Sequence, residues 1–205
     1  VSGSLCFGTR NQQKRQMVTE IAATLAFSAI QNNDKIGVIF FSDKIEKYIP
    51  PKKGRKHILY IIRELLDFTP QSNQTDISVA LEFLSGVAKR HCTAFMMSDF
   101  YDRKSFLHPL TISNRKHDVV AIQVYDWWER RLPDVGLLKV RDAESGYEQY
   151  IDTGSKKLRD LHQRNWNNRQ ASLHEVFTKS NVDNVSIATD EDYVKQLMML
   201  FRKRN

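Results

Sequence analysis

Hydrophobic positions along the chain follow two patterns: short continuous apolar runs and longer stretches with helical spacing. The apolar runs at 36–41, 93–97 and 119–124 predict strands that are buried on both faces. Between and after these runs, apolar residues recur every three or four positions. That spacing predicts helices over 14–31, 55–68, 76–90, 104–110, 155–179 and 189–204.

Four further strands complete the predicted elements. A strand at 45–49 follows 36–41 after a three-residue turn and ends at Pro50-Pro51, and another strand covers 182–187. Two strands at 137–141 and 147–151 flank Glu144-Ser145-Gly146 and form a hairpin. Strands that alternate with helices predict an α/β fold, a three-layer sandwich with a mainly parallel sheet, one antiparallel edge strand and a small β-hairpin insertion.

Composition narrows the class of protein. Only 8 Gly and 5 Pro are spread over 205 residues and no segment reads as a linker, so we expect a single domain over 1–205. No apolar run is long enough to predict a membrane segment, and 2 cysteines cannot build a disulfide framework or a four-ligand zinc site. Lys and Arg number 31 against 24 Asp and Glu, a net charge of +7. These cations are dispersed and form no nucleic-acid-binding motif, so we expect no nucleic-acid partner.

Small oxygen-bearing side chains gather where parallel strands should end. Ser2 and Ser4 lie in the opening loop, Thr75 precedes a predicted helix and Asp99 follows a buried strand. In open α/β sheets, ligands bind beyond the carboxyl ends of the strands. Hydroxyls, a carboxylate and waters suit a hard cation such as Mg²⁺. Taken singly, the serines are also turn formers, Thr75 a helix N-cap and Asp99 a turn residue.

Two other groups of residues are candidates for binding. Trp127 and Trp128 follow a strand end, where exposed aromatic residues suit a partner contact, although packing under the segment at 132–133 is an equal alternative. A basic patch is predicted at the opposite edge of the sheet. The antiparallel strand at 45–49 returns the chain to that edge, and the strand at 119–124 starts there. The residues of the patch are Lys52, Lys53, Arg55, Lys56, Arg115 and Lys116.

The three loops resemble those of a von Willebrand factor A-like domain, which has a Rossmann-like fold. The likeness rests on Val1-Ser2-Gly3-Ser4, Thr75-Asp76-Ile77 and Ser98-Asp99-Phe100. Segments at 36–43, 50–54, 117–121 and 132–136 also resemble the bacterial family called domain of unknown function fifty-eight. The resemblance implies a metal-ion-dependent adhesion site for Mg²⁺ or Mn²⁺. Ser2 and Ser4 would be direct ligands, Thr75 and Asp99 would bind directly or through water, and a partner protein's carboxylate would complete the site.

The sequence departs from this pattern at its start. The family's first ligand, an Asp, would stand just before Val1, at the end of a central strand that is also absent from this sequence. We therefore expect the cation to bind weakly or not at all in this chain, and another segment to fill the position of that strand.

The resemblance implies a non-catalytic interaction module in the bacterial cytoplasm. Such a module would act as an adaptor for a MoxR-type AAA+ ATPase in the maturation of a protein complex. The alternative from another class is a Mg²⁺-dependent hydrolase or nuclease that uses Asp99 and Asp102. A third possibility is a basic protein that binds anionic polymers.

Overall fold

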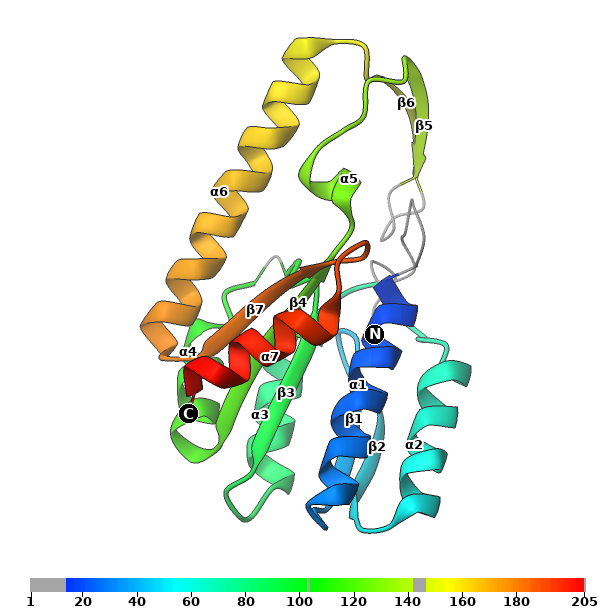
Figure 1. Cartoon of the computed structure of the whole chain (residues 1–205). Helices are drawn as coiled ribbons and strands as arrows, with labels where there is room; N and C mark the ends of the chain where they lie inside the picture. The colour runs from blue at the N-terminus through cyan, green and yellow to red at the C-terminus, as the bar shows by residue number, and fades with distance from the viewer. Residues whose placement is uncertain (1–13, 103, 142–146, 205) are drawn as a thin grey trace.

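The computed structural model describes residues 14–102, 104–141 and 147–204 (Figure 1). Ser2 and Ser4 lie outside this part of the chain. In chain order the elements are α1 (Lys14–Gln31), β1 (Ile36–Phe41), β2 (Ile45–Lys52), α2 (Arg55–Asp67), α3 (Ile77–Val87), β3 (Thr93–Ser98), α4 (Leu107–Lys116), β4 (Asp118–Tyr125), α5 (Trp127–Arg130), β5 (Leu137–Arg141), β6 (Glu148–Asp152), α6 (Lys156–Ser180), β7 (Asp183–Ala188) and α7 (Tyr193–Arg204).

A parallel sheet of three strands, ordered β3-β4-β7, forms the centre of the α/β fold. Thr93 of β3 pairs with Asp118 at the start of β4, and Asp183 of β7 pairs with Val120. All three strands therefore run in the same direction and end at the same edge. The central strand β4 is the most deeply buried, in agreement with its continuous apolar run.

Helices cover both faces of this sheet. Val119 and Ala121 of β4 pack with residues of α3, α4 and α6, whereas Ile122 and Val124 pack with residues of α1 and α7. Side chains alternate between the faces of a strand, so one apolar run supplies both cores. The order of layers is helices, sheet, helices, as the sequence pattern predicts.

The antiparallel pair β1–β2 forms a sheet of its own within the described residues, covered by α2. We expected one continuous sheet, but no strand of the described part joins β1 to β3. The expected end of the second strand at Pro50-Pro51 is also wrong, because β2 continues to Lys52. The register shifts between Ile36 and Val38, opposite the prolines, and such irregular edge positions tolerate a residue without an N–H.

Three helices start later in the chain than the sequence pattern predicts. The helix expected at 104–110 is α4, which covers Leu107–Lys116 and follows the buried Phe106. The last helix starts at Tyr193 rather than at residue 189, and Asp192 accepts hydrogen bonds from Val194 N and Lys195 N in its first turn. Asp76, and not Thr75, caps α3 by accepting from Ser78 N.

The hairpin β5–β6 is antiparallel as predicted, with Leu138 opposite Ile151. It lies beyond the carboxyl edge of the parallel sheet, beside the start of the long helix α6 (Figure 1). Among the residues that the structure describes, no helix is both long and apolar enough to cross a membrane.

Candidate functional site

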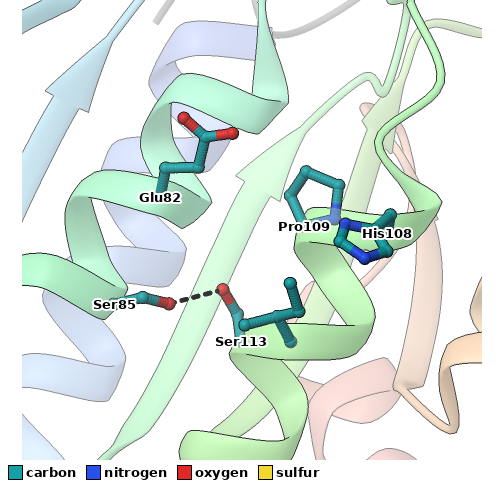
Figure 2. A pocket seen from close by; sticks show the side chains of 6 residues that line it. Glu82, Ser85, His108, Pro109 and Ser113 are labelled. Carbon is teal, nitrogen blue, oxygen red and sulfur yellow. Dashed lines mark hydrogen bonds between the residues drawn. The ribbon is translucent and has the colours of Figure 1, made fainter.

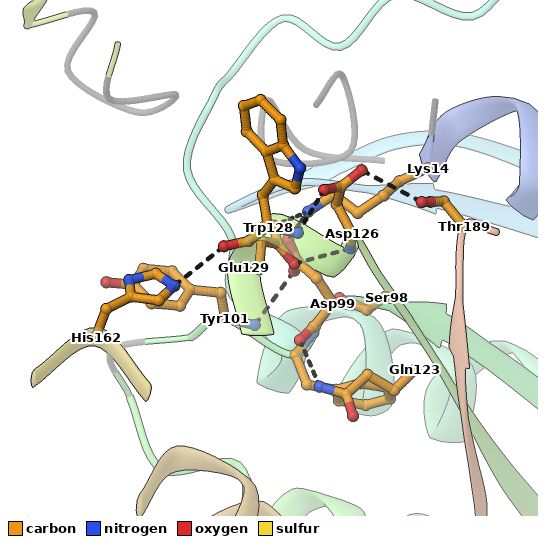
Figure 3. Close-up of polar contacts among 11 residues, drawn as sticks. Lys14, Ser98, Asp99, Tyr101, Gln123, Asp126, Trp128, Glu129, His162 and Thr189 are labelled. Atoms are coloured by element: carbon orange, nitrogen blue, oxygen red, sulfur yellow. Dashed lines mark hydrogen bonds and ion pairs between the residues drawn. The ribbon is translucent and has the colours of Figure 1, made fainter. Parts of the chain in front are cut away.

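The carboxyl ends of the parallel strands carry a buried network of polar side chains, shown in Figure 3. Asp99 follows β3, Asp126 follows β4 and Thr189 follows β7. Each of the three is at most 5% exposed. The network therefore lies where the strand order of an α/β sheet places ligands.

Lys14, the first residue of α1, is the central cation of the network. Its side chain is fully buried, and its Nζ lies 3.1 Å from Asp99 Oδ2 and 2.6 Å from Glu129 Oε1. Burial lowers the pKa of Lys14, but the attraction of the two carboxylates outweighs that effect and raises the pKa above its ordinary 10.5. The sequence pattern gives no sign of this role, because a lysine at the start of a helix is usually solvated.

The loop that carries Asp99 is held by its neighbours. Phe100 has a φ of 54°, in the left-handed region that a bulky residue rarely adopts, and its N–H donates to Ser98 Oγ at 3.0 Å. Gln123 Nε2 donates to the Asp99 carbonyl at 3.3 Å, and Tyr101 N donates to Asp99 Oδ1 at 3.2 Å. Both carboxylate oxygens of Asp99 thus have partners, and the side chain is pre-positioned.

Asp126 organises the short helix α5, which the sequence analysis did not predict. Its Oδ1 accepts from Trp128 N at 2.8 Å, and its own N–H donates to Glu129 Oε2 at 3.2 Å, which makes a capping box. The hydroxyl of Thr189 donates to Asp126 Oδ2 at 3.2 Å. This hydrogen bond joins the end of β7 to the start of α5.

The loop of Thr75 is tied to the loop of Asp99 through Asp102. Asp102 Oδ2 accepts from Ile77 N and Asp102 Oδ1 from Lys104 N, both at 2.8 Å. Lys104 Nζ in turn lies 2.6 Å from Asp76 Oδ2. The structure therefore brings the second and third predicted loops together, and Thr75 is half-buried.

The described residues bring several oxygen-bearing side chains to this edge. The ammonium of Lys14 contacts the carboxylates of Asp99 and Glu129, and Asp126 joins Glu129 through the capping box of α5. Within the described ranges, no three His, Cys, Asp or Glu residues are grouped so that they could hold a metal by themselves. A metal here would need hydroxyl ligands as well, and Asp99 would act through water because its oxygens are engaged.

The two predicted partner-contacting tryptophans start α5. Both are half-buried, and Arg130 stacks over Trp127 with its guanidinium 5.1 Å from the ring centre. The indole of Trp128 points away from the polar network (Figure 3), while its carbonyl lies 3.1 Å from His162 Nε2. Partly exposed aromatic surface therefore borders the site.

The predicted basic residues lie at the other end of the strands. Lys52 pairs with Ile36 at the start of β1, and Arg115 and Lys116 end α4 just before β4 starts. All six predicted residues, Lys52, Lys53, Arg55, Lys56, Arg115 and Lys116, are exposed.

A groove between α3 and α4 has a volume of about 290 Å³ and contains none of the predicted site residues (Figure 2). Ser85 and Ser113 face each other across it, with their hydroxyl oxygens 3.0 Å apart, and Ser113 Oγ also donates to the Leu81 carbonyl. These hydroxyls hold the two helices together.

The ion pairs of Lys14 predict a pH dependence of stability. A pKa that is raised in the folded state adds stability that is fully present below 10.5 and is lost as the pH rises through the folded-state value. We expect the difference in unfolding free energy between wild type and Lys14→Met to stay constant up to about pH 10 and then to shrink. Denaturant titrations at stepped pH measure this difference, and a decline already between about pH 6 and 8 would contradict the assignment.

Comparison with known proteins places the chain in a family. The model of the family described as "Protein of unknown function DUF58" matches residues 1–172. Uncharacterized proteins of Mycobacterium bovis and Mycobacterium tuberculosis are 28% identical over 208 residues, with 100% of this chain and 65% of their own length covered. The chain thus spans about two thirds of the length of these relatives.

Two solved structures share the fold. One is the conserved hypothetical protein BatB of Bacteroides thetaiotaomicron, with a TM-score of 0.67, 12% identity, and 100% of this chain and 93% of that chain covered. The other is an aerotolerance-related membrane protein of Bacteroides fragilis, with a TM-score of 0.65, 13% identity, and 98% and 94% covered. Because the family model matches most of the chain, this chain belongs to the DUF58 family.

Proposed function

We propose that this domain is a non-catalytic, von Willebrand factor A-like interaction module that binds a carboxylate of a partner protein through Mg²⁺ or Mn²⁺. Ser2, Ser4, Thr75 and Asp99 would hold the cation. The observation that carries the proposal is the buried, pre-positioned Asp99 at the carboxyl ends of the parallel strands. The cation would supply a positive bridge between two acidic groups.

Repulsion between like charges explains why a cation would be needed for such a partner. A partner carboxylate that approaches the carboxylates of Asp99 and Glu129 meets charges of its own sign. A divalent cation removes this repulsion. The same arrangement makes binding dependent on the cation rather than on a large apolar surface.

The contacts of the carboxylates favour binding over hydrolysis. A hydrolase or nuclease that used Asp99 and Asp102 would need both side chains to face one reacting point. Instead, the two carboxylate oxygens of Asp102 accept hydrogen bonds from the backbone N–H groups of Ile77 and Lys104. Its role in the described structure is to join two loops.

The proposed partner is a MoxR-type AAA+ ATPase in the cytoplasm, for which the domain would act as an adaptor in the maturation of a protein complex. This choice of partner is what the resemblance to the family of domain of unknown function fifty-eight implies. Trp127 and Trp128 would add apolar contact next to the cation, since partly exposed aromatic residues often carry much of the energy of an interface.

Calorimetric titration of the protein with MgCl₂ and with MnCl₂ tests the cation site. Thr75→Val removes a ligand hydroxyl but no helix cap, because Asp76 caps α3. We expect it to weaken cation binding at least about tenfold. Thr111→Val is the matched control, since that hydroxyl only donates to Leu107 O within α4. Equal affinities in wild type and Thr75→Val would overturn the cation site.

Two further measurements separate the proposed classes of function. Capture of a purified MoxR-type ATPase should occur with Mg²⁺ and be lost with a chelator; capture that a chelator leaves unchanged would contradict the cation bridge. Hydrolysis of a phosphodiester that Asp99→Ala abolishes would establish the enzyme instead.

A further inference from the structure

Two carboxylate oxygens from different segments converge on one atom, the Nζ of Lys14 (Figure 3). Asp99 Oδ2, from the loop after β3, lies 3.1 Å from this atom, and Glu129 Oε1, from α5, lies 2.6 Å from it. The side chain of Lys14 is fully buried, whereas that of Lys47, which pairs with Glu64, is 39% exposed. The ammonium of Lys14 is therefore enclosed at the edge of the sheet where a ligand would bind.

Both carboxylates are held in place by contacts that do not involve Lys14. The second oxygen of Asp99 accepts a hydrogen bond from Tyr101 N at 3.2 Å. The second oxygen of Glu129 accepts from Asp126 N at 3.2 Å, within the capping box of α5. The two oxygens that face Lys14 would thus stay close together if the ammonium moved away.

The ammonium of Lys14 has the place and the contacts of a bound cation. Carboxylate oxygens that converge on one point are also what a hard divalent cation binds, at about 2.0–2.1 Å for Mg²⁺. An ammonium and a divalent cation repel each other strongly at such short range, so both cannot remain between the same two oxygens. Lysine suits a cation that has to leave, because its ammonium is a point charge at the end of a flexible stem.

We propose that Lys14 is an internal competitor of the divalent cation. Its ammonium takes the cation's place at Asp99 and Glu129, and Asp99 Oδ2 becomes free for direct ligation only after Lys14 has moved away. This role rests on the cation site of the proposed function and names the residue that controls its occupancy. While Lys14 is in place, Asp99 can contribute to the site only through water. Once Lys14 has moved, Glu129 Oε1 offers a second carboxylate oxygen beside Asp99.

Substitution of Lys14 by methionine removes the competitor. In unfolding experiments followed by circular dichroism, MgCl₂ and MnCl₂ should stabilise Lys14→Met increasingly with concentration, because a ligand that binds only the folded state stabilises it. From this dependence we expect Lys14→Met to bind the cation at least about tenfold more tightly than the wild type, since one repelling charge is gone. Sodium chloride at the same ionic strengths should not reproduce the effect, because screening is not specific for divalent ions.

A second substitution covers the case in which Lys14→Met does not fold without added cation. Lys14→Gln also lacks the charge, but its amide can still donate a hydrogen bond to a carboxylate. It should show the same gain in cation affinity. For Lys14→Met itself, recovery of the folded spectrum on addition of MnCl₂ would then be the readout.

Two further variants locate the effect. Lys47→Met removes the same charge from an ion pair that is partly exposed, and should respond to the cations as the wild type does. Lys14→Met combined with Asp99→Asn keeps both side chains close to their size but removes the carboxylate, and should lose most of the response.

The role of Lys14 is overturned if Lys14→Met and Lys14→Gln respond to the divalent cations no more than the wild type does, or if the response survives Asp99→Asn. Equally tight binding to the wild type and to both Lys14 variants would leave the cation site standing and remove only the competition. Capture of the partner that a chelator leaves unchanged would instead contradict the proposed function.

Discussion

Replacement of Lys14 by methionine should lower the free energy of unfolding by about 3–5 kcal/mol, because breaking a buried ion pair leaves an uncompensated charge. Lys14 is fully buried, and the substitution would leave Asp99 and Glu129 without the ammonium that both contact. Methionine has nearly the same length and fills the same space. The loss would therefore come from electrostatics and hydrogen bonding rather than from a cavity.

Urea unfolding followed by circular dichroism measures this loss. Lys47→Met is the matched control: Lys47 forms a similar ion pair with Glu64 at 2.5 Å, but at a solvent-exposed position where screening by water removes most of its value. We expect the control to unfold close to the wild type. If the two variants unfolded alike, Lys14 would not be the residue that holds the carboxyl ends of the strands together.

The second large effect is expected from Asp126→Ala, with a loss of about 2–4 kcal/mol. The substitution removes the N-cap of α5, worth about 1 kcal/mol, and leaves the buried Thr189 hydroxyl without its acceptor, which costs about 1–3 kcal/mol. Asp126 is fully buried and Thr189 is 4% exposed, so water cannot readily replace either bond.

A double-mutant cycle with Thr189→Val isolates the second contribution. Valine keeps the shape of threonine and removes the hydroxyl, so the double variant should be more stable than the sum of the single losses predicts. Tryptophan fluorescence should also change in Asp126→Ala, because Trp127 and Trp128 start the helix that Asp126 caps. Strict additivity, with unchanged fluorescence, would show that Asp126 does not organise α5.

Several elements of the fold follow from the sequence pattern because the physics that produces them is local. β4 is one continuous apolar run, and a segment that is buried on both faces can contain little else. The long helix α6 starts at Lys156 behind a serine cap and ends at Asn181 in the left-handed conformation, both of which are local signals. The hairpin β5–β6 pairs two strands that are close together in the sequence.

The candidate site was only partly predictable, because its contacts join segments that are far apart in the sequence. The strand-end rule located Asp99 and Thr75 on neighbouring loops, since it depends only on strand direction. Their partners are distant in the chain: Asp99 lies 85 positions from Lys14, and Asp126 lies 63 positions from Thr189. Nothing near Lys14 or Thr189 in the sequence indicates such a contact.

By itself, then, the sequence determined the alternation of strands and helices, the buried faces and the edge of the sheet at which a ligand would bind, because periodicity and strand direction are properties of short segments. Only the tertiary structure decided that a lysine is fully buried at that edge, that a four-residue helix carries Trp127 and Trp128, and that Asp102 joins two loops. Those features arise where buried polar groups must find partners, and the partners come from whichever segments the fold brings together.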